Sequence, residues 1–237
     1  MQNLRPGYTP EQLTGKLSVQ HATPVLYRFM RVEYVDEFLA SGRLMISSIP
    51  RCRKLEDLCR NDSHESLYEY EFEFVDRTIN VQAQVGMNAF VLCSSLTPSA
   101  IHHREDSVCL ELHHWEQLAV EIGEQLRKQG YAIAEIFAGA CNYAIKSRSI
   151  NMSGSSSTFL CDSGGVSDPK KMDEILGSIG REAFYTTKDI WFIREHEFRV
   201  LWLSNTKVPD EPVFVTIQNP EKFGCKVIAL GETYEKA

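Results

Sequence analysis

The sequence has no run of about 18 apolar residues, no hydrophobic signal region at its start and no excess of basic side chains. The first two absences predict a protein that neither spans a membrane nor follows the usual secretory route. The formal net charge of −7 argues against non-specific binding to nucleic acid or to an anionic membrane. We therefore expect a cytoplasmic protein without a membrane partner.

Motifs of several common enzyme folds are also missing. The chain contains no G-x-G-x-x-G and no Walker sequence, so the usual cradles for dinucleotides and triphosphates are excluded. It contains no G-x-S-x-G, which argues against a serine hydrolase.

Cysteine and histidine give no recognised metal motif. The seven cysteines form no C-x-x-C pair, which favours reduced and mostly buried thiols over disulfides or a zinc ribbon. The pairs His102-His103 and His113-His114 have no carboxylate or cysteine at a familiar ligand spacing. We therefore predict no metal site.

Many short apolar segments alternate with few helical patterns, which predicts an α+β fold on a mixed or antiparallel sheet with three or four helices. We expect a single domain over residues 24–232, after a polar arm at 1–23 and before a tail at 233–237. The clearest strand is 68–74, where aromatic and glutamate side chains alternate. Residues 25–29, 34–39 and 43–48 predict a strand, a helix and a strand, with Gly42 ending the helix.

Further helices are expected at 115–126 and from Asp168, where an aspartate cap precedes Pro169. Between them, residues 151–167 are rich in serine and glycine, which predicts a mobile loop or hairpin. Strands are expected at 90–97, 108–112, 131–137, 143–146, 213–217 and 225–230.

The stretch 184–203 has the strongest functional pattern. It runs into an apolar strand that carries Glu195 and Glu197 at its start. If the backbone is extended, the two carboxylates share a face and His196 points to the other. Each would raise the pKa of the other unless a cation such as Lys188 lies between them. Solvated ion pairs on an exposed strand edge are the simpler interpretation.

Other candidate ligand groups lie earlier in the chain. Arg28 is a cation among apolar residues of the first strand, and is either an edge residue or an anion clamp. Arg51 belongs to the most basic patch of the sequence and could contact a phosphate. Ser94 and Ser95 end an apolar strand, where serines either contact ligands or start turns.

Several segments resemble, in the same order, a bacterial family that is catalogued only as a domain of unknown function. The most specific segment is K-x-x-W-x-x-x-E-x-E-x-R between Lys188 and Arg199. The resemblance covers residues 25–232 approximately, but Glu56-Asp57-Leu58 stands where the family usually has asparagine, aspartate and proline. The other matching segments are 26–29, 41–50, 55–62, 90–95, 108–112 and 226–232.

The order of these motifs is similar to the arginine, Ser-x-Ser and glutamate triad of the ADP-ribosyltransferase superfamily. The resemblance implies NAD as a substrate, Glu197 as the catalytic glutamate and Glu195 as the residue that activates the acceptor. It implies a glycosyltransferase with a protein or nucleic-acid acceptor, acting as a toxin or an antiviral defence effector, with an antitoxin or other regulatory partner. The expected NAD contacts are Arg28, Tyr27, Ser94, Ser95, Arg51 and Lys188.

Two other functions stay open at this point. In a non-catalytic binding or regulatory module, Lys188, Glu195 and Arg199 would form a structural ion-pair network. In a metal-dependent phosphodiesterase or nuclease, Glu195, Glu197 and Asp57 would hold magnesium.

Overall fold

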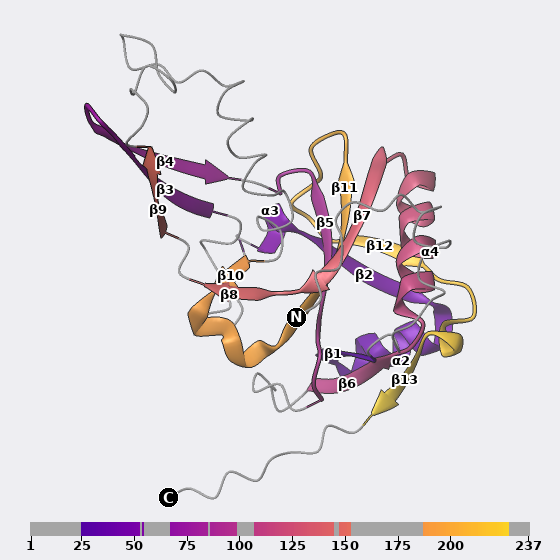
Figure 1. Ribbon diagram of the computed structural model, residues 1–237. Helices are drawn as coiled ribbons and strands as arrows, with labels where there is room; N and C mark the ends of the chain where they lie inside the picture. Colours follow the sequence, from indigo (N-terminus) through magenta and orange to yellow (C-terminus); the bar gives the residue numbers. More distant parts are fainter. Residues whose placement is uncertain are drawn as a thin grey trace, which may run out of the picture.

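The fold is described from a computed structural model, which covers residues 25–52, 54, 67–84, 86–98, 107–144, 147–152 and 187–227 (Figure 1). The predicted arm at 1–23, the helix from Asp168 and the tail at 233–237 lie outside these residues, as does most of the serine- and glycine-rich segment. No helix in the described part is long and apolar enough to cross a membrane.

The main sheet has eight strands, and all its pairs are antiparallel. Its main path runs in the order β12 (Val213–Thr216), β2 (Arg43–Ser48), β5 (Ala89–Ser95), β1 (Leu26–Arg31), β6 (Ser107–Leu112) and β13 (Gly224–Val227). Strands β2 and β1 pair with different parts of one edge of β5. The other edge of β5 pairs along its whole length with β11 (Glu197–Ser204), which in turn pairs with β7 (Ile133–Ala140). This arrangement makes β5 a central strand.

Two smaller sheets add the parallel pairs. One contains β4 (Thr78–Gln84), β3 (Leu67–Phe74) and β9 (Ser147–Met152), and β3 pairs with β9 in parallel. The other joins β8 (Asn142–Ala144) and β10 (Thr187–Asp189), also in parallel. In Figure 1 both lie to the left of the main sheet, and α4 lies to its right. The predicted α+β class with a mostly antiparallel sheet is confirmed.

The helical segments are α2 (Val32–Ser41), α3 (Ile49–Cys52), α4 (Trp115–Lys128), η2 (Ile190–Glu195) and η3 (Pro220–Lys222). The predicted strand–helix–strand unit is confirmed as β1, α2 and β2. Gly42 ends α2 with φ +72°, and its N–H donates to the carbonyl of Phe38. A side chain at Gly42 would lie 2.0 Å from the carbonyl oxygen of Ile217, so glycine is required there for both conformation and space.

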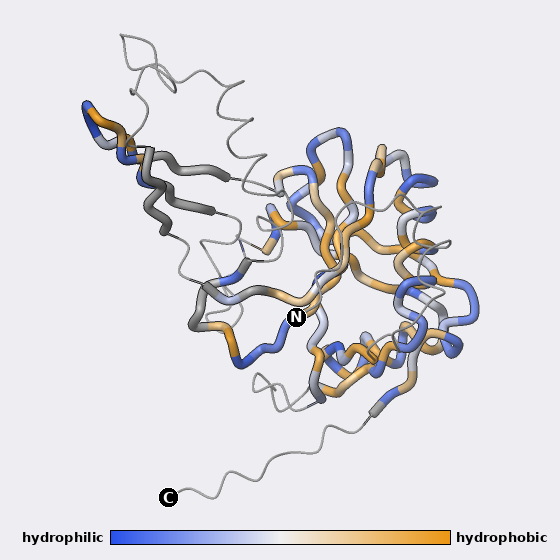
Figure 2. The backbone as a smooth tube through the Cα atoms, viewed as in Figure 1, coloured by the Kyte–Doolittle hydropathy of each residue, from blue (hydrophilic) through white to orange (hydrophobic). Residues whose placement is uncertain are grey.

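The larger core lies between one face of the sheet and the helices α2 and α4. Helix α4 buries the predicted stripe of apolar residues against the strands, and the indole of Trp202 donates a 2.8 Å hydrogen bond to the carbonyl of Ala119. Figure 2 shows apolar residues along these strands and hydrophilic residues along the outer turns. A smaller apolar cluster around Ile49 and Leu201 covers part of the opposite face.

Candidate functional site

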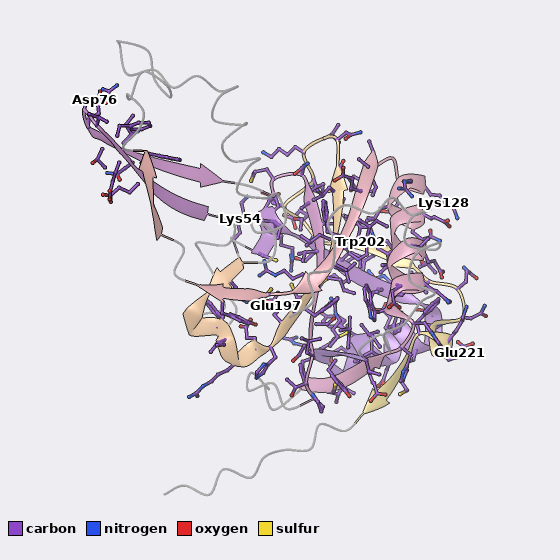
Figure 3. All side chains as sticks on the ribbon, viewed as in Figure 1. Lys54, Asp76, Lys128, Glu197, Trp202 and Glu221 are labelled. Atoms are coloured by element: carbon purple, nitrogen blue, oxygen red, sulfur yellow. The ribbon has the colours of Figure 1, made fainter. Side chains whose placement is uncertain are left out.

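The second face of the sheet carries a cluster of charged side chains at the start of β11. Strand β10 supplies Lys188, the last residue of η2 is Glu195, and Glu197 begins β11. His196 between them has φ +44°, so the chain turns sharply there and is not extended as the shared-face prediction assumed. The two glutamates still reach the same lysine. Figure 3 shows Glu197 at the junction of β8, β10 and the main sheet, far from the peripheral Lys128.

Four charged groups form a continuous buried network. The ammonium group of Lys188 donates to Oε2 of Glu195 and, at 2.8 Å, to Oε2 of Glu197. The guanidinium of Arg199 donates from Nε to Oε1 of Glu197, also at 2.8 Å. Lys188 lies 4.5 Å from the ring centre of Phe192, which adds a cation–π contact. The prediction of solvated ion pairs on an exposed edge is therefore wrong, because the side chain of Glu195 is only 15% exposed and those of the other three charged residues at most 8%.

The network moves the two carboxyl pKa values in opposite directions. Burial raises the pKa of Glu195 from 4.5 to about 7; Lys188 opposes this rise and the neighbouring Glu197 adds to it. Burial alone would also raise the pKa of Glu197, but Arg199 and Lys188 outweigh it and hold that pKa well below its usual range. Near neutral pH, Glu195 can exchange a proton while Glu197 stays ionised.

Two hydroxyl groups hold the turn that carries the glutamates. The hydroxyl oxygen of Tyr143 accepts a 2.7 Å hydrogen bond from the backbone N–H of Glu197. Burial raises the pKa of Tyr143 well above its usual value. Ser95 Oγ donates to the backbone carbonyl of Glu195 at 2.9 Å and accepts from the N–H of Thr97. Ser95 therefore supports the position of Glu195 through its own hydroxyl.

Cys93 is an exposed residue on the face of the sheet that carries the charged network. It stands directly opposite Arg199 on the central strand β5, yet Cys93 is exposed while Arg199 is 2% exposed. An exposed side chain in the middle of a sheet is reached by solvent from the face that Glu197 occupies. The surrounding protein still desolvates the thiol, which raises its pKa well above the ordinary value, and the negative charge of Glu197 raises it further.

The strand register decides which predicted residues meet at this face. Directly paired residues share a face, so Tyr27, Ser95 and Glu197 form one row across β1, β5 and β11. Arg51 lies in α3, and Ile49 of the same helix packs against the apolar cluster on this face.

Arg28 and Ser94 lie on the opposite face of the sheet, because each is adjacent in the chain to a member of that row. The guanidinium of Arg28 donates to the carbonyl of Met45 at 3.2 Å, and Ser94 is 7% exposed. Arg28 and Ser94, which the resemblance expects to contact the same NAD molecule as Glu197, therefore do not share a face of the sheet with it.

Cys93 and Tyr143 were not identified as candidates from the sequence. Tyr143 pairs with Lys188 in the parallel ladder of β8 and β10, which no local pattern reveals. For Cys93 a signal existed, since it alternates with Ser95 along one strand, but the facing partner Arg199 is known only from the register. Asp57, the third proposed magnesium ligand, lies outside the described residues, and Lys188 bridges the other two carboxylates.

Comparison with protein-family models, curated proteins and solved structures finds no match. The resemblance to the bacterial family and to ADP-ribosyltransferases therefore rests on the motifs quoted above.

Proposed function

We propose that the protein is an enzyme in which Glu195 transfers a proton and Glu197 stays ionised. The observation that carries this proposal is the buried network itself, in which Lys188 bridges the two carboxylates and Arg199 also binds Glu197. This arrangement raises the pKa of Glu195 to about 7 and holds the pKa of Glu197 far below its usual range. Pairs of titratable groups separated in this way are typical of acid–base catalysis, because each pKa then suits one role at neutral pH. The exposed Cys93 beside them gives solvent access to the same face.

The reaction that we propose is transfer of ADP-ribose from NAD, as the resemblance implies. The bond from ribose C1′ to the nicotinamide nitrogen breaks, and its electron pair leaves with neutral nicotinamide. An acceptor hydroxyl or a water molecule then bonds to C1′ and gives its proton to Glu195. Acid–base assistance of this kind typically contributes about 10²–10⁴-fold to a rate.

Two features of the site decide which residues belong to the proposed NAD site and which glutamate contributes to catalysis. Arg28 and Ser94 face the other side of the sheet and are not part of the proposed NAD site. Tyr27 and Arg51 remain the proposed NAD contacts, whereas the buried Ser95 and Lys188 hold the two glutamates in place. The charge of Glu197 is balanced by two cations, so it offers little net attraction to a positively charged sugar. Proton transfer by Glu195 is therefore the catalytic contribution that the geometry favours.

The test is nicotinamide release from NAD by the purified protein and two matched variants. Glu195→Gln removes the proton-exchanging group and keeps its shape, so we expect a loss of at least ~100-fold in rate. The wild-type rate should rise with pH and have its midpoint near pH 7, because Glu195 accepts a proton only when it is ionised. Glu124→Gln, an exposed glutamate on α4, is the control and should keep the wild-type rate. Full activity in Glu195→Gln contradicts the role of Glu195.

A second candidate function is a binding or regulatory module without chemistry. The observation that favours it is the closed network, in which both oxygens of Glu197 are already bonded to cations. A melting experiment separates the two functions. NAD at 100 times its dissociation constant stabilises a protein that binds it by about 2.7 kcal/mol, whereas the module should show no shift with NAD.

A further inference from the structure

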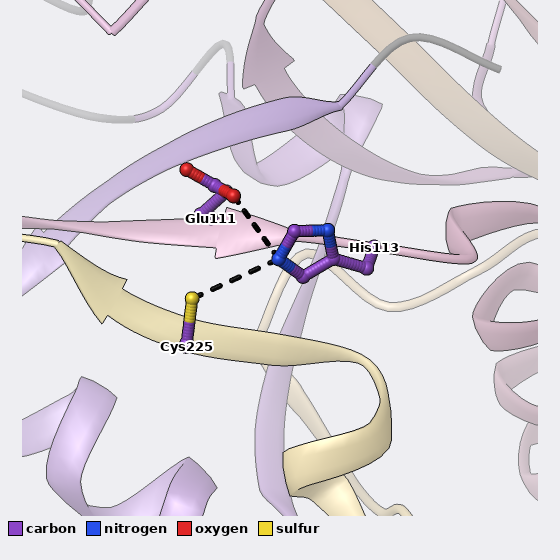
Figure 4. Close-up of side chains that lie close together, drawn as sticks. All are labelled: Glu111, His113 and Cys225. Carbon is purple, nitrogen blue, oxygen red and sulfur yellow. Dashed lines mark hydrogen bonds and ion pairs between the residues drawn. The ribbon is translucent and has the colours of Figure 1, made fainter. Parts of the chain in front are cut away.

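A second cluster of chemically reactive side chains lies on β6 and β13, outside the charged network. Glu111 and Cys225 pair directly across the two strands, so their side chains share a face. His113 follows the end of β6, and its backbone N–H donates to the carbonyl of Phe223 at 2.7 Å, which fixes it beside β13. Figure 4 shows the side chains of Glu111 on β6, Cys225 on β13 and His113, just past the end of β6, lying close together.

The convergence is on one atom of the histidine ring. Nε2 of His113 lies 3.0 Å from Oε1 of Glu111 and 3.7 Å from Sγ of Cys225. A ring nitrogen carries at most one proton, so it can donate to only one of these partners. In a nucleophile–base–acid relay the carboxylate would bond to the opposite nitrogen, Nδ1. The shared nitrogen therefore argues against a Cys-His-Glu relay and favours a cation between the three groups.

We propose that Glu111, His113 and Cys225 bind a zinc ion, with a water molecule as the fourth ligand. Their ligand atoms all lie within 4.8 Å of one another. Ordinary zinc bond lengths in a tetrahedron place nitrogen and oxygen ligands about 3.4 Å apart, and nitrogen and sulfur ligands about 3.6 Å apart. The two observed separations, 3.0 and 3.7 Å, need only small side-chain shifts to meet these values.

The ligand types select the metal. Thiolate and imidazole suit zinc, whereas magnesium and calcium prefer oxygen ligands alone. The side chain of His113 is 38% exposed and that of Glu111 25%, so water can reach the fourth position. Sites with three protein ligands and one water exchange that ligand, unlike closed structural sites with four. Zinc here would also fasten the edge strand β13 to β6.

The sequence alone does not reveal this site, because its ligands are not neighbours in the chain. His113 and Cys225 are 112 residues apart, and the carboxylate belongs to the strand before the histidine. The buried Cys109 on the same strand is not part of the group of three ligand atoms that converge.

The test is a calorimetric titration of the metal-free full chain with zinc. We expect one tight site per chain, and cobalt in place of zinc should give the absorption of tetrahedral thiolate coordination. Cys225→Ser and His113→Gln should weaken binding by more than the roughly 10–100-fold that follows loss of a supporting group around a metal. Zinc should raise the melting temperature of the wild type and not of these variants.

Two controls keep the assignment specific. His114→Asn changes the adjacent exposed histidine, whose φ of +47° asparagine tolerates, and Cys93→Ser removes another exposed thiol. Both should bind zinc like the wild type. Equal melting temperatures in chelator show that the ligand variants fold. The proposal is overturned if the wild type binds no zinc, if Cys225→Ser binds it unchanged, or if either control abolishes binding.

Discussion

Lys188 and Glu197 form an ion pair, with 2.8 Å between Nζ and Oε2, and both side chains are less than a tenth exposed. The same ammonium group also serves Glu195. One cation therefore holds two carboxylates together at the start of β11, and the ionisation of both depends on it. The stability of this part of the fold and the proposed chemistry rest on the same lysine.

Removal of the lysine charge should destabilise the fold. Lys188→Met leaves Glu195 and Glu197 buried together with Arg199 as the remaining cation of the network, and breaking a buried pair costs about 3–5 kcal/mol. Urea unfolding measures the loss. The control is Lys54→Met, which breaks the exposed pair with Asp210 and should cost at most about 1 kcal/mol. Equal losses in the two variants would show that burial of the network contributes nothing.

The raised pKa of Glu195 should make the fold less stable as the pH rises from about 4.5 to 7. In this range the folded chain holds a proton on Glu195 that the unfolded chain has released, because the pKa is about 7 when folded and 4.5 in its ordinary state. The free energy of unfolding then falls with pH, by about 3 kcal/mol in total from this group. Glu197 acts in the opposite sense, but its lowered pKa places its effect below pH 4.5.

Urea unfolding at several pH values between 5 and 7 measures this slope. Glu195→Gln cannot ionise, so the fall in stability should be smaller in this variant than in the wild type. Glu124→Gln, exposed on α4, should keep the wild-type slope. The same slope in Glu195→Gln and the wild type would show that Glu195 is not responsible.

Local patterns predicted most of the regular structure. The helix stripe of α4 and the glycine stop of α2 are confirmed, because both depend on residues a few positions apart. The prediction for the segment 184–203 was only partly right. The segment contains the expected strand from Glu197, but a 3₁₀ helix precedes it and His196 adopts a left-handed conformation.

The composition of the site depended on register, which the sequence does not specify. A shift of one residue moves a side chain to the other face of a sheet, so the choice between Ser94 and Ser95 could not be made from the strand alone. The pairing of Ser95 with both Tyr27 and Glu197 decides it. The same register separates Arg28 from Glu197, although both lie in strands that adjoin β5.

Ser94→Ala should leave nicotinamide release unchanged and should not destabilise the fold. Ser94 Oγ is buried and has no hydrogen-bond partner in the described part of the chain, so its removal relieves an unsatisfied polar group. We expect a gain of up to about 1 kcal/mol in the free energy of unfolding. Ser95→Ala is the matched variant, and it should reduce activity because Ser95 Oγ bonds to the backbone of Glu195. Loss of activity in Ser94→Ala alone would return Ser94 to the site.

Exposure and reactivity should diverge at Cys93. The thiol is open to solvent, but desolvation and the charge of Glu197 raise its pKa well above 9, and only the thiolate is a strong nucleophile. Iodoacetamide should therefore modify Cys93 slowly at pH 7 to 8, and more slowly than the exposed Cys225 in the presence of a chelator. Peptide mass spectrometry measures both rates in one sample. In Glu197→Gln, with the neighbouring charge removed, Cys93 should react faster than in the wild type. Rapid labelling of wild-type Cys93 at pH 7 would contradict the raised pKa and would make this thiol a candidate nucleophile.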